Sequence, residues 1–412
     1  MRLNQICIIY ICIRCKSISE GWRNMITKFD SLFAGHVDMD DIGYGGTAVN
    51  DRRFDNDHLM TVYSKSEAIA KALDENGFDT MWMAEHHFQP EGYECIPNLI
   101  MLNVHLAHLT KNLKFGCGFN IATMWHPLRL AEDFATADIL TEGRVIFGVG
   151  RGYHTREVET FGSDITDQAA NREQFEEAVD VIFKAFNNES FSHQGKYYTL
   201  PPEVPYRGYT LKKLTLVPRP ATLPVECWQP IQGGTQRALD FMAKHGIKGI
   251  LGGGVAEGGV MDDIMIGYRD ALVRAGNKGA QLGEGLSVGF HYHMAPTVEQ
   301  AMAEAQGFFE ENLKMFGPLR LSRGMTEEQI EIMGDPRRAP TAGLPTIQEA
   351  VEKQAFLAGP PERIIEQLKS VEENYPALER IGMSHPMGTP QSVITDQIEW
   401  FGKEVMPAFK GK

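Results

Sequence analysis

The sequence lacks the features that mark membrane-spanning and nucleic-acid-binding chains. Its 412 residues contain no run of about 18 apolar residues, the length that a bilayer-crossing helix needs. The formal charge is −14, from 40 basic and 54 acidic residues, and no basic stripe with interleaved aromatic residues occurs. We therefore expect neither a membrane nor a nucleic acid as a partner. A small phosphorylated ligand stays open, because it needs only an arginine and some backbone amides.

Cysteine is also scarce. Six cysteines are too few for a disulfide framework, and the three beyond the N-terminal segment lie far apart in the sequence. This usage favours a reducing cytoplasm. The other three form Cys7-x4-Cys12-x2-Cys15, a spacing similar to part of an iron–sulfur site but without an obvious fourth ligand, so we expect no cluster.

The first 24 residues form a segment unlike the rest of the chain. An isoleucine- and cysteine-rich run is followed by basic residues without a small-residue cleavage site, so the segment is a poor signal peptide. Met25, in contrast, precedes a strand-like run. We hypothesise that translation naturally begins at Met25, that residues 1–24 are a non-native or disordered extension, and that residues 25–412 form the functional domain.

The remaining chain has the composition of a globular protein with a large core, with 43% hydrophobic and 23% charged residues. Short β-rich runs alternate with segments of helical period, which predicts parallel strands joined by right-handed crossovers. This alternation indicates an α/β fold, the (β/α)8 or TIM barrel with insertions, with an open doubly wound sheet as the alternative. The eight expected strands are 27–33, 80–84, 113–120, 144–150, 225–232, 247–251, 287–294 and 380–384.

Two helices and three irregular stretches complete the expected organisation. One helix begins at Pro127, a favoured first-turn residue, and another spans about residues 171–186. Residues 35–58 and 318–345 interrupt the alternation, and we expect the second to be a lid over the barrel mouth, with a solvated insertion as the alternative. The proline-rich residues 201–224 predict a strand-containing excursion before the fifth strand.

Two adjacent histidines stand where the second expected strand enters a loop, in Glu85-His86-His87-Phe88. Successive strand side chains point to opposite faces, so His86 and His87 cannot both address one small ligand. We expect one of them to take part in chemistry and the other to pack. Adjacent histidines do not converge on a metal as an i, i+4 pair does, so we expect no metal. Taken alone, a buried structural histidine is the simpler interpretation.

Glycine-rich segments stand at the ends of the following strands, where barrel enzymes assemble their sites. Gly148-Val-Gly150-Arg151-Gly152 ends the fourth strand, but Tyr153 stands where a dinucleotide fingerprint needs its third glycine. Small residues there let a planar ligand approach the backbone, and Arg151 offers a fork-shaped cation suited to phosphate. A surface turn with a solvated arginine is the alternative.

Gly233-Gly234-Thr235 follows the fifth strand and precedes a segment of helical period. Exposed first-turn amides and a hydroxyl at such a place form an anion site. A simple helix cap by Thr235 is the other interpretation. Arg151 on the neighbouring strand favours a phosphate site.

These segments together resemble the bacterial luciferase-like flavin monooxygenases, over nearly all of residues 25–409. The resemblance implies a TIM barrel that holds FMN at its carboxyl-terminal mouth. The matching motifs are Gly77-Phe-Asp-Thr-Met-Trp82 leading into Glu85-His-His-Phe88, His126-Pro-Leu-Arg-Leu-Ala-Glu132, Asp138-Ile-Leu, Gly143-Arg144, Gly148-Val-Gly-Arg-Gly152, Gly359-Pro-Pro-Glu-Arg-Ile364 and Val405-Met-Pro407.

The resemblance also implies roles for single residues. His86 occupies the position of the catalytic histidine, and Arg151 that of the arginine on the flavin phosphate. The Gly118–Phe119 bond matches the position of a non-proline cis peptide behind the flavin ring. The full set of implied cofactor-binding residues is Gly118, Phe119, Asn120, Arg151, Gly152, Gly233, Gly234 and Thr235.

The reaction implied by the resemblance is the oxygenation of a small organic substrate by reduced FMN and O2. A separate flavin reductase would supply the reduced FMN, His86 would manage protons, and we expect a homodimer. Gly150 stands where light-emitting relatives carry cysteine, and residues 252–254 are glycines where those relatives are bulkier. A substrate wider than a straight-chain aldehyde is therefore expected.

Three alternatives remain at this point. A deazaflavin (F420) dehydrogenase of the same superfamily would transfer hydride without O2. A flavin-binding relative without turnover is the second alternative. The third is a metal-dependent barrel hydrolase that uses His291 and His293, whose alternate side chains share one face of the seventh strand.

Overall fold

The structure is a computed structural model that describes residues 26–252, 260–322, 325–335, 337 and 343–409. Eight parallel strands follow one another around a closed barrel, because β5 pairs with β10 and β14 pairs with β1. The expected TIM barrel is confirmed, and each expected strand segment contains one of these strands. They are β1 (Lys28–Phe33), β2 (Thr80–Met83), β3 (Lys114–Cys117), β5 (Val145–Gly150), β10 (Cys227–Pro230), β11 (Lys248–Leu251), β12 (Leu286–Met294) and β14 (Arg380–Ser384).

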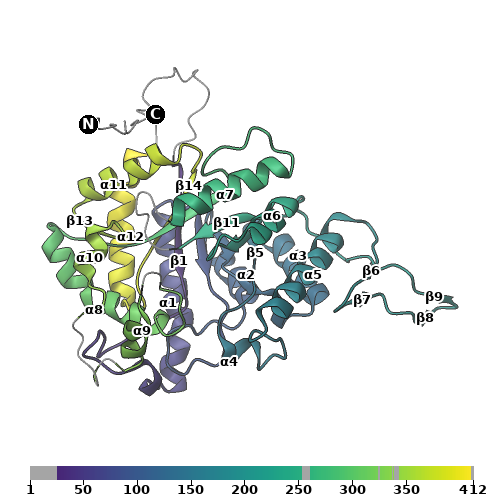
Figure 1. Ribbon diagram of the computed structural model, residues 1–412, viewed down its shortest axis with the longest axis horizontal. Helices are drawn as coiled ribbons and strands as arrows, with labels where there is room; N and C mark the ends of the chain where they lie inside the picture. The colour runs from purple at the N-terminus through teal and green to yellow at the C-terminus, as the bar shows by residue number, and fades with distance from the viewer. Residues whose placement is uncertain (1–25, 253–259, 323–324, 336, 338–342, 410–412) are drawn as a thin grey trace, which may run out of the picture.

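Helices surround the barrel (Figure 1). The expected helix at Pro127 begins there, with proline in its first turn, and the second expected helix starts earlier, because Asp167 accepts the amides of Ala169 and Ala170. No helix in the described ranges is long and apolar enough to cross a membrane. The main helices are α1 (Asn56–Glu75), α2 (Leu99–Leu109), α3 (Pro127–Leu140), α5 (Gln168–Asn187), α6 (Gln236–His245), α7 (Val260–Arg274), α8 (Val298–Phe316), α11 (Pro361–Asn374) and α12 (Gln391–Glu404).

The inward side chains of the barrel form layers. One layer is filled by large side chains, and the next layer toward the carboxyl ends of the strands is filled less completely. Trp82 donates its indole N–H to Asp30 over 2.9 Å, and Arg380 pairs with the same carboxylate. Trp82 also meets Trp228 edge to face across the barrel. Two residues further along a strand the side chain faces inward again. There β1 carries Leu32, which is 42% exposed, while β5 and β14 carry glycine. The carboxyl-terminal end of the barrel is therefore open.

Two segments meet at this end. The Tyr44 hydroxyl, in the loop after β1, donates to the Pro345 carbonyl over 2.8 Å, and Arg337 forms a 2.6 Å ion pair with Asp51. The expected lid segment therefore packs on the loop after β1. It also contains a helix, α9 (Glu327–Gly334), that the sequence analysis missed, although Thr326 and Gln329 form a capping box. α10 (Ile347–Glu352) and β13 (Phe356–Gly359), which pairs with β12, follow it.

The proline-rich stretch forms the expected excursion. One short strand pair lies within residues 201–224 and another lies just before them, and both project away from the barrel beside α5 in Figure 1. They are β6 (His193–Gln194), β7 (Thr199–Leu200), β8 (Pro205–Tyr206) and β9 (Tyr209–Thr210). The remaining short elements are β4 (Asn120–Ile121), α4 (Thr155–Val158) and the 3-10 turns η1 (Val49–Asp51), η2 (Ala122–Met124) and η4 (Met406–Ala408).

Candidate active site

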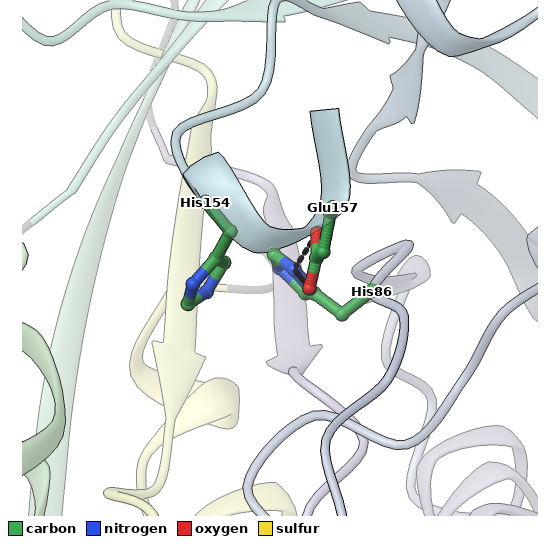
Figure 2. Close-up of side chains that lie close together, drawn as sticks. All are labelled: His86, His154 and Glu157. Carbon is green, nitrogen blue, oxygen red and sulfur yellow. Dashed lines mark hydrogen bonds and ion pairs between the residues drawn. The ribbon is translucent and has the colours of Figure 1, made fainter. Parts of the chain in front are cut away.

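His86 is buried just beyond β2 and both of its ring nitrogens have partners. Its Nδ1 lies 3.1 Å from Oε2 of Glu157, a residue of the short helix α4 that follows β5 (Figure 2). Its Nε2 lies 2.9 Å from the Tyr153 hydroxyl and 3.2 Å from Oε1 of Glu94. Two carboxylates therefore flank the ring, one at each nitrogen.

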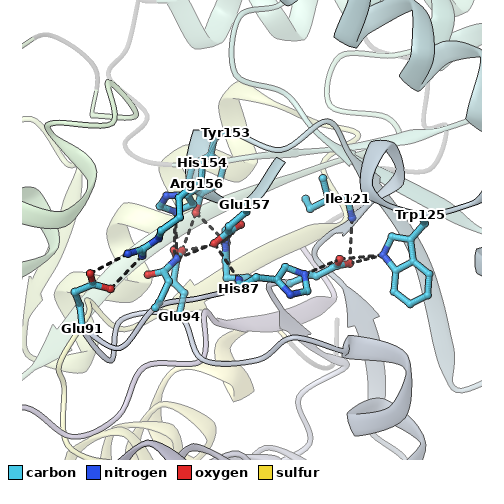
Figure 3. Close-up of polar contacts among 12 residues, drawn as sticks. His87, Glu91, Glu94, Ile121, Trp125, Tyr153, His154, Arg156 and Glu157 are labelled. Carbon is cyan, nitrogen blue, oxygen red and sulfur yellow. Dashed lines mark hydrogen bonds and ion pairs between the residues drawn. The ribbon is translucent and has the colours of Figure 1, made fainter. Parts of the chain in front are cut away.

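Further hydrogen bonds hold the two carboxylates in place (Figure 3). The Tyr153 hydroxyl donates to Glu94 over 2.7 Å, and Nε2 of His154 lies 3.0 Å from the other Glu94 oxygen. The amide of Gln89 reaches both Glu94, at 2.9 Å, and Glu157, at 3.0 Å. We call Gln89, His86, Glu94, Tyr153, His154 and Glu157 the His86 network.

The network favours a charged imidazole. Burial opposes the charge, but the carboxylates of Glu94 and Glu157 outweigh it and hold the pKa of His86 above its ordinary value. Burial likewise opposes ionisation of Glu157, yet its hydrogen bond and ion pair with His86 lower the pKa of Glu157 to about 2. Burial and the charge of Glu94 raise the pKa of Tyr153 well above its ordinary value, so its hydroxyl remains a donor. The two carboxylates therefore favour the charged form of His86 more than water does.

His87 belongs to a different set of contacts. Its Nε2 lies 3.2 Å from Glu85, and its ring meets Phe161 edge to face. Glu85 also accepts the indole N–H of Trp125 over 2.9 Å and the backbone N–H of Ile121 over 3.1 Å. The two neighbouring histidines thus serve different groups, and Glu85 fixes the chain that follows β3.

Close packing shapes the chain between β3 and β4. The Gly118–Phe119 bond is cis, as the family resemblance suggested for this position. A Cβ added to Gly148 would lie 1.8 Å from the Cys117 carbonyl oxygen, whereas one added to Gly150 would lie 3.3 Å from Cβ of Phe119. Gly148 is therefore required by the backbone, whereas a side chain at Gly150 would require only a small shift of Phe119.

Asn120 is a buried residue with an incomplete set of partners. Its side-chain amide donates to the Gly148 carbonyl over 3.0 Å, but its Oδ1 has no hydrogen-bond partner. Buried polar atoms are nearly always satisfied. The free oxygen of Asn120 therefore marks a place for a donor that the chain itself does not supply.

The expected phosphate residues lie on neighbouring strand ends. Arg151 follows β5 and is half-buried, and its guanidinium makes only long contacts, 3.2 Å to Asn171 and 3.4 Å to Gln168. Burial and the nearby charge of Arg172 lower the pKa of Arg151. This cation is therefore poorly compensated.

Thr235 follows β10, the partner of β5, and occupies the N-cap of α6. Its hydroxyl makes no capping bond, so the simple cap interpretation does not describe it. A Cβ on Gly233 would meet no atom within 4 Å, and Gly234 has a positive φ of 56°. The turn therefore leaves helix amides and a hydroxyl open to an anion.

The structure brings the expected site residues to one end of the barrel. Tyr153 stands two positions after Arg151 and contacts His86, which links the histidine to the arginine segment. His293 pairs instead with Glu304 on α8 at 2.9 Å. Residues 253 and 254 lie outside the described residues, as do Cys7, Cys12 and Cys15.

A group of metal-ligand type also occurs in the network. The ligand atoms of His86, His154 and Glu157 lie within 4.8 Å of one another (Figure 2). Both ring nitrogens of His86 and both oxygens of Glu157 already have hydrogen-bond partners. We therefore interpret the group as a proton network.

A cleft of about 500 Å³ reaches the network from the side of α1. His86, Gln89 and Glu94 belong to its lining, and most of its other walls are apolar. These walls include Leu59, Met60 and Tyr63 of α1 and Phe88, Pro90 and Pro97 of the loop after β2.

Sequence reasoning missed Glu94, Tyr153 and Glu157. Glu94 stands eight positions after His86, and Glu157 is brought to the ring by the chain reversal after β5. The signal that could have found Glu157 is its place seven residues beyond the end of β5, a strand end that carries other site residues.

The sequence profile of the luciferase-like monooxygenases matches residues 45–377 of this chain. The chain belongs to this family. The match covers the barrel from the loop after β1 to the segment before β14, and therefore contains every expected site residue.

Curated relatives match over a smaller part of the chain. The oxygenase component of flavin-dependent trigonelline monooxygenase from Acinetobacter baylyi is 26% identical over 37% of this chain and 41% of its own length. Limonene 1,2-monooxygenase from Rhodococcus erythropolis is 28% identical over 39% of this chain and 40% of its own length. The matched segments thus span less than half of these relatives.

Several solved structures share this fold over nearly the whole chain. The oxygenating constituent of 3,6-diketocamphane monooxygenase from Pseudomonas putida, in complex with FMN, has a TM-score of 0.66 at 19% identity and covers 93% of this chain and 98% of its own. An F420-dependent secondary alcohol dehydrogenase has a TM-score of 0.64 at 14% identity and covers 94% and 100%. Both kinds of cofactor therefore occur on this fold.

Proposed function

We propose that this protein is the oxygenase of a two-component flavin monooxygenase. It takes reduced FMN from a separate reductase and uses O2 to oxygenate a small organic substrate. The observation that carries the proposal is a buried His86, flanked by Glu94 and Glu157, at the barrel end where the arginine and glycine–threonine segments also lie. Membership of the monooxygenase family supports it.

The residues at the barrel mouth suit FMN. Its flat ring would lie over the carboxyl-terminal layer of the barrel, where β5 and β14 carry glycine. The unpartnered Oδ1 of Asn120 is an acceptor for a donor on the ligand. Arg151, with Gly152 beside it, and the Gly233-Gly234-Thr235 turn would hold the phosphate. Gly118 and Phe119 would lie behind the ring. Reduced FMN would supply the electrons that activate O2.

The chain's own residues would control protons and water. His86, held as an imidazolium, is a proton donor whose orientation is fixed by Glu157 and Tyr153. We propose that the segment 318–345, whose Arg337 and Pro345 contact the loop after β1, covers the mouth and limits the entry of water.

A second copy of the chain is the partner that we propose for one outer face. α2 and α3 lie side by side and expose Met101, Leu109, Ile139 and Leu140. Large apolar side chains gathered on neighbouring helices mark an interaction surface. Analytical ultracentrifugation of the wild type and a Leu140→Asp variant tests this, since the variant should sediment as a monomer.

The F420 dehydrogenase is the second candidate, favoured by the F420-dependent structures of the same fold. Anaerobic titration of the purified protein with reduced FMN, and separately with F420, distinguishes the two. We expect reduced FMN to bind and then to be oxidised through a transient absorbance change after mixing with O2. Tight binding of F420 with O2-independent turnover would overturn the proposal. Bound FMN without an O2-dependent transient would instead indicate a flavin-binding relative without turnover.

A further inference from the structure

The His86 network contains one more buried carboxylate than the ring needs for its orientation. Glu157 alone fixes the Nδ1 side of His86. Glu94 is equally buried and faces the other nitrogen, both directly at 3.2 Å and through the Tyr153 hydroxyl. A buried carboxylate is costly unless its charge is compensated, so a second one at the same ring calls for a reason.

Glu94 differs from Glu157 in its position relative to the cleft, although both side chains are buried. Together with His86 and Gln89, Glu94 lines the cleft between α1 and residues 86–97, whereas Glu157 and Tyr153 do not. The cleft is open to solvent along Met60, which is 51% exposed. The cleft therefore connects an exposed side chain of α1 with Glu94, the carboxylate on the Nε2 side of His86.

We propose that Glu94 is the residue that reloads His86 with protons, and that the cleft between α1 and residues 86–97 is the path by which these protons arrive from solvent. The inference rests on the proposed function in one respect, namely that His86 acts as a proton donor. It assigns a role to Glu94 and to this cleft that is separate from cofactor binding.

The proton balance is simple. After the imidazolium gives up its Nε2 proton, a neutral ring remains. Its Nδ1–H group still donates a hydrogen bond to the Glu157 carboxylate. Glu94 takes one proton from water in the cleft and passes it to the Tyr153 oxygen while Tyr153 passes its own proton to Nε2. One proton has then moved from solvent to His86, and Glu94 and Tyr153 have returned to their starting states.

The groups around the ring permit this path. Glu157, Glu94 and, further away, Glu85 raise the pKa of His86, while its burial opposes them. His154 contacts Glu94 from the side of α4. The nearby Arg156 is bound to Glu91 at 2.9 Å and so does not take the place of His86 as the partner of Glu94.

The test is proton exchange in the full chain without any cofactor, followed by NMR of the protein labelled with 15N in histidine. The ring N–H protons of His86 should exchange with water at a measurable rate. Met60→Trp, which fills the cleft, should slow this exchange several-fold. Val273→Trp is the matched control, because Val273 is 41% exposed on α7 outside the cleft, and it should leave the rate unchanged.

Glu94 itself is tested by Glu94→Gln and Glu94→Asp. The glutamine variant should slow the exchange and lower the titration midpoint of His86 by about one unit or more, and aspartate should restore much of both. Unchanged exchange in both Met60→Trp and Glu94→Gln would overturn the proposal. This readout needs no flavin, so a failure of the monooxygenase assignment would not change the proton-exchange result. A failure of the proton path would likewise leave the monooxygenase assignment standing.

Discussion

His86 Nδ1 lies 3.1 Å from Glu157 Oε2, although 71 residues separate the two in the sequence. The barrel creates this contact, since β2 and β5 both flank β3 and their carboxyl ends open to the same side. The contact holds the histidine in one orientation and favours its charged form. Its consequences can be measured.

Glu157→Gln should remove an acid-sensitive part of the stability. The folded pKa of Glu157 is about 2 against an ordinary 4.5, so its ionised form stabilises the fold fully above pH 4.5, and this contribution is lost as the pH falls from 4.5 toward 2. A shift of this size corresponds to on the order of 3 kcal/mol.

Urea denaturation of both proteins at about pH 6 and about pH 3 checks this expectation. The wild type should lose more stability than Glu157→Gln between the two conditions. Parallel losses would show that the His86–Glu157 pair does not stabilise the folded state.

His86→Gln should lower turnover by about 10²- to 10⁴-fold, the usual contribution of a positioned proton donor. Binding of reduced FMN should change little, because the phosphate residues are untouched. Steady-state kinetics and a flavin titration separate the two effects. His105→Gln, an exposed histidine of α2 that pairs with Glu67, is the control and should behave as the wild type.

Arg151→Gln should weaken FMN binding by about tenfold or more, since a hydrogen bond to a charged group contributes about 1.5–3 kcal/mol. Riboflavin, which lacks the phosphate, should bind both proteins alike. Fluorescence titration with the two flavins measures the difference. Arg129→Gln on the exposed face of α3 is the matched control. An equal loss for both flavins would place Arg151 away from the phosphate.

Gly148→Ala and Gly150→Ala should differ in stability, although both positions lie at the end of β5. The added Cβ would lie 1.8 Å from the Cys117 carbonyl at Gly148, so the backbone must move, whereas at Gly150 the nearest atom is 3.3 Å away. We expect a loss above about 3 kcal/mol for the first and below about 1.5 kcal/mol for the second. Thermal unfolding compares them, and equal melting temperatures would contradict the packing.

Much of the fold was predictable from local patterns. Short β-rich runs separated by helical segments identified all of the barrel strands, and Pro127 marked the start of its helix to the residue. α9 and β13 escaped detection because short elements depend on contacts with distant segments, here Met333 of α9 with Tyr44 and β13 with β12.

The candidate site was predictable only in part. His86 and Arg151 stood out because titratable side chains at strand ends have few purely structural explanations. Glu94 and Tyr153 gave no such signal, since a glutamate and a tyrosine in loops are ordinary surface residues. Their burial around one imidazole, with Tyr153 bonded to Glu94 at 2.7 Å, is visible only in three dimensions.

The amino-acid sequence by itself determined the alternation of strands and helices, because hydrophobic period is a local property, whereas closure of the barrel depends on the pairing of β14 with β1 and of β5 with β10. It also placed an imidazole, a guanidinium and a glycine–threonine turn at strand ends. Only the tertiary structure decided the charge of His86 and its route to solvent. Both depend on the distance and burial of carboxylates that lie on other loops, and electrostatic energy in a buried site is set by those distances.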